Sequence, residues 1–388
     1  FKQKTAYEIG VRLVGSEMCI RDRIVGGGIA GCATAYYLAQ QGISSMIVES
    51  HGIGSKASGK SAGMLSPVHG AKEPGTIDEI SLESFNLHQV LADELIEETG
   101  IDFSPRFPNQ LQIAIDLKGM DEIRFLQSLY EKADDRFESH FFEYEELNLI
   151  QPGLTPKTLG GLLLKGNTSV NSELLTQALA KGAELKGSEV VNSTVTGINK
   201  VGQKIESVQV GNEKIFCDLI VLAMGPWTLF AQEWFEFRIP MLPLKGEILR
   251  VSLPNSENLL SHEIYTDKIS IYPRTDGLVW IGATEQEKGF DESISEDSRK
   301  YLLNTAKEVF PEVQNASVDV HTACLRPIIS DYLPLVDAIP SLQNAFIVTG
   351  GAKKGILLAP AMGKAISDMI SNNGQTDITI KNYGFSRF

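Results

Sequence analysis

The stretch from residue 24 to residue 50, IVGGGIAGCATAYYLAQQGISSMIVES, decides the fold of this chain. It reads as an apolar strand, a glycine-rich turn, a helix of small residues and a second apolar strand. Gly26 permits the tight turn, Gly28 lets the backbone approach a pyrophosphate, and Gly31 lets the helix pack closely on the strand. The free N–H groups at the start of the helix favour an anion. The stretch therefore predicts a dinucleotide-binding unit, to which Ile29 and Ala30 also belong.

Glu49 ends the second strand, 18 residues after Gly31, and Ser50 follows it. A carboxylate at this point can accept hydrogen bonds from ribose hydroxyls and disfavours the 2′-phosphate of NADP. A glycine-rich turn without a ligand is the alternative interpretation. The order of strand, turn, helix, strand and acid favours a dinucleotide.

Residues 1–23 do not fit the strand that should precede the turn. A central strand of a parallel sheet is buried on both faces, whereas Arg21, Asp22 and Arg23 occupy the positions where this strand should begin. Burying unpaired charges is costly. The segment LVGSEMCIRDR, residues 13–23, resembles translated sequencing-adapter read-through. We therefore predict a non-native or disordered extension over 1–23; the alternative is a genuine but unusual N-terminal extension.

Composition excludes several classes of function. The 35 Lys and Arg residues against 49 Asp and Glu give a net charge of −14, which disfavours nucleic-acid binding. No run of 18 apolar residues predicts a membrane span, and no secretory signal is evident. The four cysteines show no CxxC pair, which suits a reducing cytoplasm. The six histidines have no metal-ligand spacing, so no metal is expected.

Five further segments carry a resemblance to a known family. They are SGKSAGMLSP (58–67), LIVLAMGPW (219–227), PLKGEILR (243–250), LRPIISDYLPLVD (325–337) and TGGAKKGILLAPA (349–361). In this order they resemble the motifs of the D-amino-acid oxidase family of FAD enzymes. Within the family, SAGMLSP and GILLAPA are most similar to the glycine oxidases of the thiamine pathway. The resemblance implies FAD as the cofactor.

The resemblance also implies which residues contact the cofactor. The loop against the flavin would contribute Ser58, Ser61, Ala62, Gly63 and Met64. The adenosine would lie near Val195, Ala223, Gly225 and Trp227, and the C-terminal motif would contribute Gly351, Lys353, Lys354, Gly355 and Ile356. The alternatives are a plain surface loop at 58–66, a buried strand end at 223–225 and a hairpin feature at Lys245-Gly246.

The substrate site requires an anchor for a carboxylate, and arginine binds carboxylates in a bidentate manner. Arg326 matches the carboxylate-binding arginine of the family; an internal salt bridge, for example with Asp331, is the alternative. Two departures from glycine oxidase cast doubt on glycine itself. Lys353 stands where members carry a second arginine. Ser270 or Ile271, with Tyr272 close by, stands where a substrate-contacting tyrosine is common.

Cys324 is two residues before Arg326. Monomeric sarcosine oxidase, a relative, carries a cysteine at a similar position that bonds covalently to the flavin. A neighbouring cation would lower the pKa of the thiol and favour this chemistry. The alternative is a small buried cysteine that packs as an apolar residue.

The fold expected from these patterns is α/β: a doubly wound FAD-binding domain interleaved with a smaller α+β substrate domain on a mixed or antiparallel sheet. Residues 246–253, 269–273 and 278–283 alternate like antiparallel strands. We expect the FAD-binding domain to comprise 24–84, 160–236 and 320–388. The substrate domain would comprise 85–159 and 237–319.

The expected activity is FAD-dependent oxidation of glycine, or of a small D- or N-methyl amino acid, to an imine that hydrolyses to a 2-oxo acid. Oxygen would be reduced to hydrogen peroxide. Three alternatives remain open: a D-amino-acid dehydrogenase that passes electrons to quinone, a sarcosine-oxidase-like enzyme, and a dinucleotide-binding module without catalysis. The expected partners are a small amino acid and an electron acceptor, with a homo-oligomer as a further option.

Overall fold

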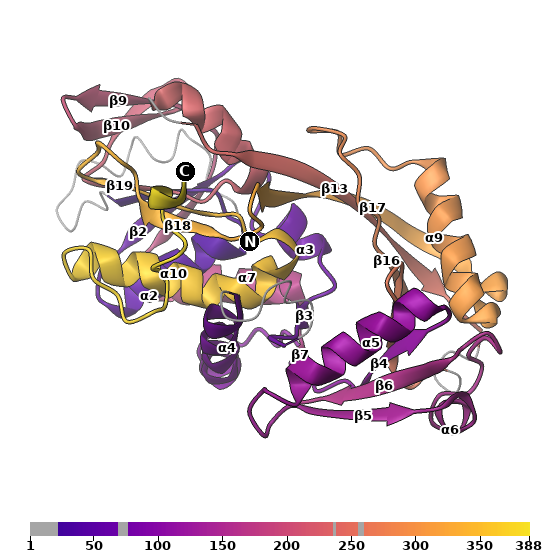
Figure 1. The fold of residues 1–388 in the computed structure, drawn as a ribbon. Coiled ribbons are helices and arrows are strands. Elements are labelled where there is room, and N and C mark those ends of the chain that lie inside the picture. Colours follow the sequence, from indigo (N-terminus) through magenta and orange to yellow (C-terminus); the bar gives the residue numbers. More distant parts are fainter. Residues whose placement is uncertain (1–21, 69–76, 236–237, 255–259) are drawn as a thin grey trace.

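The computed structural model describes residues 22–68, 77–235, 238–254 and 260–388. Figure 1 shows a nucleotide-binding half, in which helices cover a parallel sheet, and a second half built on a larger sheet. Two long strands, β13 (Met241–Ser252) and β17 (Ser317–Ile329), run between the halves. They pair with each other along their whole length.

The nucleotide-binding half is centred on a six-stranded sheet with the order β18-β19-β12-β1-β2-β8. All neighbouring strands are parallel except β18, which is antiparallel at one edge. The chain order reverses direction at β1, as in doubly wound sheets. The strands are β1 (Asp22–Val25), β2 (Ser45–Glu49), β8 (Glu189–Asn192), β12 (Leu219–Leu222), β18 (Leu335–Ala338) and β19 (Ala345–Thr349).

Two layers cover this sheet. One face carries α2, α7 and α10, against which α4 packs. The opposite face carries a three-stranded antiparallel sheet and the 3₁₀ segment η1. These elements are α2 (Ile29–Gln40), α4 (Ile77–Thr99), α7 (Ser172–Leu185), α10 (Gly355–Ser371), β9 (Val195–Val201), β10 (Lys204–Val210), β11 (Glu213–Phe216) and η1 (Gly225–Trp234).

Strand β1 includes the last two residues of the segment predicted to be a non-native or disordered extension. Asp22 and Arg23 form the first half of β1 and pair with both β2 and β12. Arg23 is only 4% exposed, and its guanidinium donates to the carbonyl oxygen of Phe216 at 3.1 Å. Burial lowers the pKa of Arg23. The strand therefore tolerates this charge because the guanidinium is hydrogen-bonded at the end of the sheet. The rest of the predicted extension, residues 1–21, lies outside the described residues.

The second half is centred on an eight-stranded sheet with the order β17-β13-β16-β15-β14-β4-β6-β5. Its pairs are antiparallel except β14 with β4, so the sheet is mixed, as expected. The remaining strands are β4 (Gln110–Ala114), β5 (Glu138–Phe142), β6 (Gly160–Lys165), β14 (Glu263–Tyr265), β15 (Ser270–Pro273) and β16 (Val279–Gly282).

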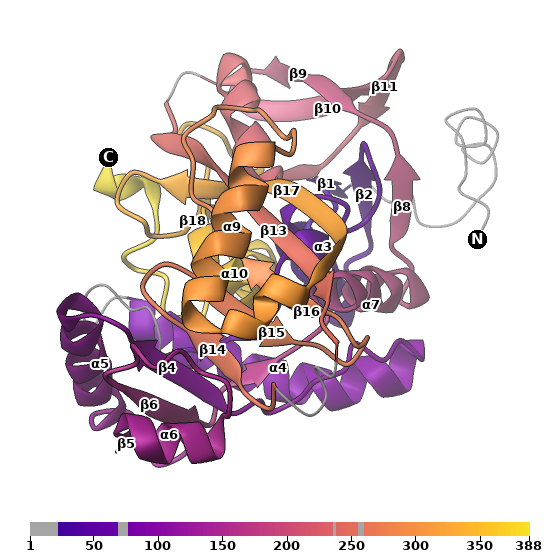
Figure 2. The same ribbon diagram turned by 90° about the vertical axis from the view of Figure 1, so that its right-hand side faces the viewer.

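Alternation along these strands creates two different faces. Leu249, Ile271 and Ile281 point to the outer face and pack against α9 (Glu296–Val309), which crosses β13 and β16 in Figure 2. The inner face looks toward the nucleotide-binding half, and α5 (Leu117–Tyr130) covers its β4 and β6 end. The inner face is therefore free to form a site with the parallel sheet.

The remaining elements are short. They are α3 (Ala57–Lys60), β3 (Met64–Leu65), α6 (Tyr144–Ile150), β7 (Thr168–Ser169), η2 (Pro311–Asn315), η3 (Ala352–Lys354) and η4 (Phe385–Arg387). Strand β3 pairs with β7 and leads the chain from the glycine-rich region toward the larger sheet.

Three of the expected domain boundaries fall inside structural units. The boundary at 84/85 lies within α4, and the boundary at 319/320 lies within β17. The boundary at 159/160 separates β6 from β4 and β5, its neighbours in the eight-stranded sheet. The ends of these elements are set by packing against residues distant in the sequence, which a local pattern does not show. The partition into two domains stays a prediction.

Candidate active site

A cavity of about 1090 Å³ lies between the parallel sheet and the inner face of the eight-stranded sheet. Its walls come from both halves: the turn after β1, the end of β2, the 56–66 loop and η1 on one side, and β13, β15, β16 and β17 on the other. Sequence segments 300 residues apart, such as those of Gly26 and Arg326, therefore meet at one site.

At the nucleotide end, the start of α2 is open to the cavity. A side chain at Gly28 would point toward Ser58, with its Cβ 3.4 Å from the Ser58 hydroxyl, so glycine keeps this approach clear. The Ser58 hydroxyl accepts a hydrogen bond from the backbone N–H of Ile29 at 2.9 Å. Ile29 and Ala30 line the cavity beside it. A helix N-terminus exposed in this manner is suited to a phosphate.

Glu49 is fixed at the end of β2 by backbone donors. Its carboxylate accepts from the N–H of Gly27 at 2.7 Å and from the N–H of His51 at 2.8 Å. Glu49 and Ser50 both line the cavity. The carboxylate is therefore held in the place predicted for a ribose contact.

Two predicted glycines do not line the cavity, and both are packing positions. A Cβ on Gly31 would collide with the carbonyl oxygen of Gly26 and come within 3.1 Å of Ala223 Cβ. A Cβ on Gly63 would collide with the carbonyl oxygen of Val170, and Gly63 has φ +72°. These glycines therefore shape the site through the backbone. The other predicted site residues line the cavity, except Ile271, which lies on the outer face.

The adenosine-side and C-terminal candidates converge on the same cavity. Thr349 connects them, because its hydroxyl donates to the carbonyl oxygen of Gly225 at 3.1 Å. The turn before α10 is tight, since a Cβ on Gly351 would lie 2.6 Å from the Cα of Gly355. The lining residues in this group are Val195, Ala223, Gly225, Trp227, Gly351, Lys353, Lys354, Gly355 and Ile356.

The 58–64 loop is tied to the larger sheet by a buried ionic network that the sequence did not predict. Arg274 donates to the carbonyl oxygen of Ala62 and pairs with Glu263 at 2.9 Å. Glu263 is 1% exposed, and it also pairs with Arg106 at 3.2 Å. The hydroxyl of Tyr265 donates to Glu263 at 2.7 Å and lies 3.0 Å from the sulfur of Met64. The network therefore fixes the position of the loop relative to β14 and β15.

Arg326 points into the cavity from β17. Its Nη1 donates to the carbonyl oxygen of Thr284 at 3.2 Å. Gly246 lies under the guanidinium, and a Cβ at Gly246 would be 2.5 Å from Arg326 Cζ. Asp331, the alternative partner, instead faces Arg387 at 3.4 Å. This arrangement leaves the guanidinium available to an anion in the cavity.

Tyr272 lines the cavity from β15 and packs edge-on against Tyr265, with ring centroids 5.5 Å apart. Arg274 lies 5.1 Å from the Tyr272 ring centroid. Burial raises the pKa of both tyrosines. Both phenols therefore stay neutral and can serve as hydrogen-bond donors.

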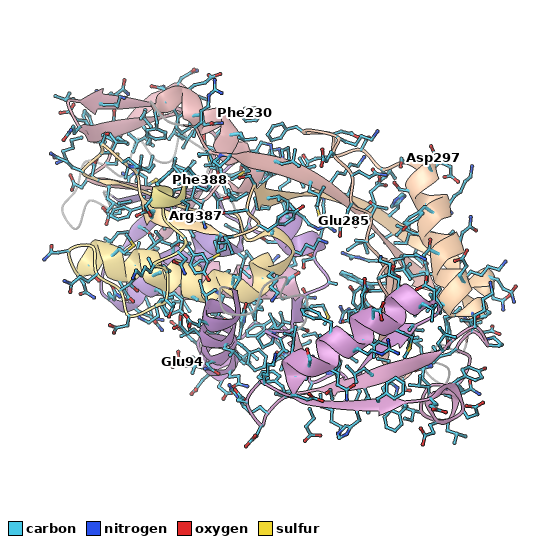
Figure 3. The ribbon with its side chains drawn as sticks, in the orientation of Figure 1. Glu94, Phe230, Glu285, Asp297, Arg387 and Phe388 are labelled. Carbon is cyan, nitrogen blue, oxygen red and sulfur yellow. The ribbon has the colours of Figure 1, made fainter. Side chains whose placement is uncertain are left out.

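Lys353 forms an ion pair with Glu285 at 2.5 Å, and both side chains are half exposed and line the cavity. Glu285 belongs to the segment after β16, between the two halves in Figure 3. The same segment places Phe290 against Phe230, with ring centroids 4.6 Å apart. Phe230 is labelled on η1 in Figure 3. Lys353 is thus held at the rim of the cavity, where its charge is neutralised.

Cys324 also lines the cavity, but its environment does not favour a thiolate. Burial raises the pKa of the thiol, an effect larger than the opposing influence of Arg326 and Lys60. The ammonium of Lys60 instead donates to the carbonyl oxygen of Ala323 at 2.9 Å. The thiol therefore stays protonated, which favours packing over covalent attachment.

In the described part of the chain, no group of three or more His, Cys, Asp or Glu residues could hold a metal ion. Among the same residues, none of the helices has the length and apolar character needed to cross a membrane.

The cavity fits FAD. Its nucleotide end offers a helix N-terminus cleared by Gly28 and the carboxylate of Glu49, and its volume continues to the small-residue loop at Ser61 and Ala62. The same space reaches the cationic side chain of Arg326. The fold and the site thus define a dinucleotide-dependent oxidoreductase in which cofactor and substrate share one cavity.

Comparison with known proteins identifies the family. The family described as FAD dependent oxidoreductase (DAO) matches residues 24–369. The chain therefore belongs to this family, and it is an FAD-dependent oxidoreductase.

Glycine oxidases are among the most similar proteins. The chain is 27% identical to glycine oxidase of Bacillus subtilis over 350 residues, which are 90% of this chain and 92% of that protein. The crystal structure of glycine oxidase from Bacillus cereus matches with a TM-score of 0.84 and 26% identity, covering 92% of this chain and 96% of that one. The structure from Geobacillus kaustophilus, at 24% identity, shares the fold with a TM-score of 0.88 over 95% of this chain and 98% of that one.

Proposed function

We propose that the protein oxidises a small amino acid, either glycine or a D- or N-methyl amino acid, to an imine that hydrolyses to a 2-oxo acid. In this proposal oxygen is the electron acceptor and is reduced to hydrogen peroxide. The observation that carries it is Arg326, whose guanidinium faces the cavity above the space left by Gly246. When bound, FAD supplies the capacity to accept a hydride, which carries two electrons, from the substrate.

The residues of the chain have separate tasks in this proposal. Arg326 binds the substrate carboxylate through its planar fork and orients the reacting carbon. Tyr272 offers a neutral hydroxyl to the bound amino acid, because burial keeps its pKa high. Lys353 is paired with Glu285, so it closes the rim instead of competing for the carboxylate. Acid–base catalysis is not required when the amine arrives neutral.

The similarity to glycine oxidases at 26–27% identity over nine-tenths of the chain supports an oxidase. It also supports the proposal that the reaction serves thiamine synthesis, the pathway of the subfamily that the motifs resemble. A dehydrogenase that reduces a quinone shares the same substrate chemistry. The two activities differ in the electron acceptor. The rates at which oxygen and a quinone reoxidise the reduced flavin therefore distinguish them.

Anaerobic mixing with amino acids tests the proposal. Glycine, sarcosine and D-alanine should bleach the flavin absorbance, and admitted oxygen should restore it with formation of hydrogen peroxide. Failure of every amino acid to bleach the flavin would show that the proposed reaction is wrong. Bleaching followed by slow reaction with oxygen and fast reaction with a quinone analogue would replace the oxidase by a dehydrogenase.

A further inference from the structure

The cavity extends far beyond the anchor for the substrate carboxylate. Ile248, Tyr272, Tyr265 and Gln112 line it from four different strands of the inner face. Five strand spacings separate β17, which carries Arg326, from β4, which carries Gln112. At about 4.8 Å per spacing this is roughly 24 Å along the sheet. Glycine spans only roughly 4 Å from its nitrogen to its carboxylate oxygens, from standard bond lengths.

We define the distal chamber as the part of the cavity lined by Gln112, Phe125, Leu126, Leu129 and Ile269. Leu126, Leu129 and Ile269 are buried, whereas Phe125 on α5 is 48% exposed. Four of these five side chains are apolar. Glu122, Thr266, Asp267 and Lys268 also line the cavity from α5 and from the turn between β14 and β15, and they form its polar rim, where Glu122 and Lys268 are exposed. The part of a ligand that enters the buried interior of the distal chamber would therefore be mainly apolar.

Gln112 is the polar exception, and its hydrogen bonding is incomplete. It is 5% exposed, and in the described part of the chain its Oε1 has no hydrogen-bond partner. A buried amide oxygen without a donor is costly, so a group that supplies one is expected. The neighbouring Gln110, by contrast, donates to Glu263 at 3.3 Å and accepts from Asn167 at 2.8 Å.

The walls of the distal chamber are connected at its rim. Lys118 pairs with Asp267 at 2.9 Å, and Lys268 faces Asp116 at 3.5 Å. These pairs connect the start of α5 with the turn between β14 and β15. The Asp267 side chain is only 5% exposed, whereas the side chains of its three partners here are exposed. Each pair is weak on its own, but both connect the same two walls.

We propose that the distal chamber binds a substituent of the substrate, carried on the α-carbon or on the nitrogen. The substituent is longer than methyl and mainly apolar, and it carries a hydroxyl or N–H group that donates to Gln112. This inference rests on the proposed function, since Arg326 holds the carboxylate. Among the amino acids that the proposed function admits, it favours one with an extended substituent over glycine.

Binding of unreactive carboxylates to the holoenzyme tests the distal chamber separately from catalysis. Calorimetry with acetate, butyrate, hexanoate, octanoate and decanoate should show affinity rising by about fourfold for each methylene that enters it. Affinity that stops rising at butyrate would overturn the proposal. 16-Hydroxyhexadecanoate, which spans roughly 20 Å from carboxylate to hydroxyl, should bind the wild type more tightly than it binds Gln112→Met; equal binding to both would overturn the role of Gln112.

Phe125→Ala and Leu117→Ala form a matched pair on α5, because Leu117 is 79% exposed and is not among the lining residues. Only Phe125→Ala should reduce the gain in affinity with chain length. An equal reduction in both variants would show an effect on the helix instead of the distal chamber, and no reduction in Phe125→Ala would exclude this side chain from binding.

Anaerobic flavin bleaching then assigns the position of the substituent. D-2-aminooctanoate should bleach the flavin faster than glycine does if the substituent is on the α-carbon. N-hexylglycine should bleach it faster than glycine does if the substituent is on the nitrogen. Faster bleaching by glycine than by both compounds would overturn the inference and leave the proposed function intact. No bleaching by any amino acid would reject the proposed function, whatever the calorimetry shows.

Discussion

Replacing Gly246 by alanine tests the environment of Arg326 without altering the arginine itself. Gly246 lies in the extended strand β13, where its φ does not require glycine. The new Cβ would be 2.5 Å from Arg326 Cζ, whereas ordinary van der Waals contact begins at 3.4 Å. The guanidinium must therefore move by at least the difference, 0.9 Å. The end of a flexible side chain can move by this amount, so the fold should be retained.

The displacement should affect catalysis strongly. Loss of one hydrogen bond to a charged group costs about 1.5–3 kcal/mol, which corresponds to about a 10- to 150-fold loss in kcat/KM. Amino acids should lose this factor in the Gly246→Ala variant, measured by stopped-flow flavin bleaching. Amines without a carboxylate should be little affected, because they do not use Arg326.

Gly197→Ala is the matched control. Gly197 lies in β9, and a Cβ there would meet no atom within 4 Å. Unchanged kinetics in Gly246→Ala, with amino acids and amines alike, would refute the assignment of Arg326 as the carboxylate anchor. Equal losses with amino acids and with simple amines would show that the arginine has a structural role.

Three further predictions concern the cofactor and stability. Glu49→Gln should weaken FAD binding by about 10- to 150-fold in Kd, because a hydrogen bond to a charged group is lost. Titration of the apoprotein with FAD measures this change, and an unchanged Kd would show that Glu49 is only structural. Acid precipitation should release all flavin, because burial raises the pKa of Cys324; a yellow pellet in the wild type that is absent in Cys324→Ser would contradict this. Burial lowers the pKa of His88 to about 4 from 6.5, so the unfolded chain binds a proton that the folded chain excludes. The free energy of unfolding should therefore fall by roughly 2 kcal/mol from pH 7 to pH 5; urea titrations should show a smaller decrease in His88→Gln, and identical slopes would contradict the prediction.

The nucleotide end of the site could be predicted from the sequence because its determinants are local. Gly26, Gly28 and Gly31 lie within six residues and act through the backbone, so their spacing alone predicts the turn and the open helix N-terminus. Glu49 follows on the next strand of the same βαβ unit. Local patterns of this kind do not depend on how distant strands pair.

Strand β17 was not apparent from periodicity, although part of it matched a family motif. Asp319, His321 and Arg326 interrupt its apolar positions, and Pro327 argues against a strand interior. Pairing with β13 along twelve positions supplies the burial that the local pattern does not show. The charge of Arg23 argues against a buried strand for a related reason, because the carbonyl oxygen that accepts its hydrogen bond, that of Phe216, is distant in the sequence.

The substrate end of the site depends on contacts that no local pattern encodes. Glu263 is an acid in an otherwise apolar strand, and its partners Arg106 and Arg274 are 157 and 11 residues away in the sequence. Only the register of the eight-stranded sheet brings them together, and that network positions the 58–64 loop predicted to lie against the flavin. The same register places Gln112 beside Tyr265 on the inner face. The residues that would choose the substrate are therefore selected by strand pairing, so a motif that identifies the cofactor does not identify the amino acid.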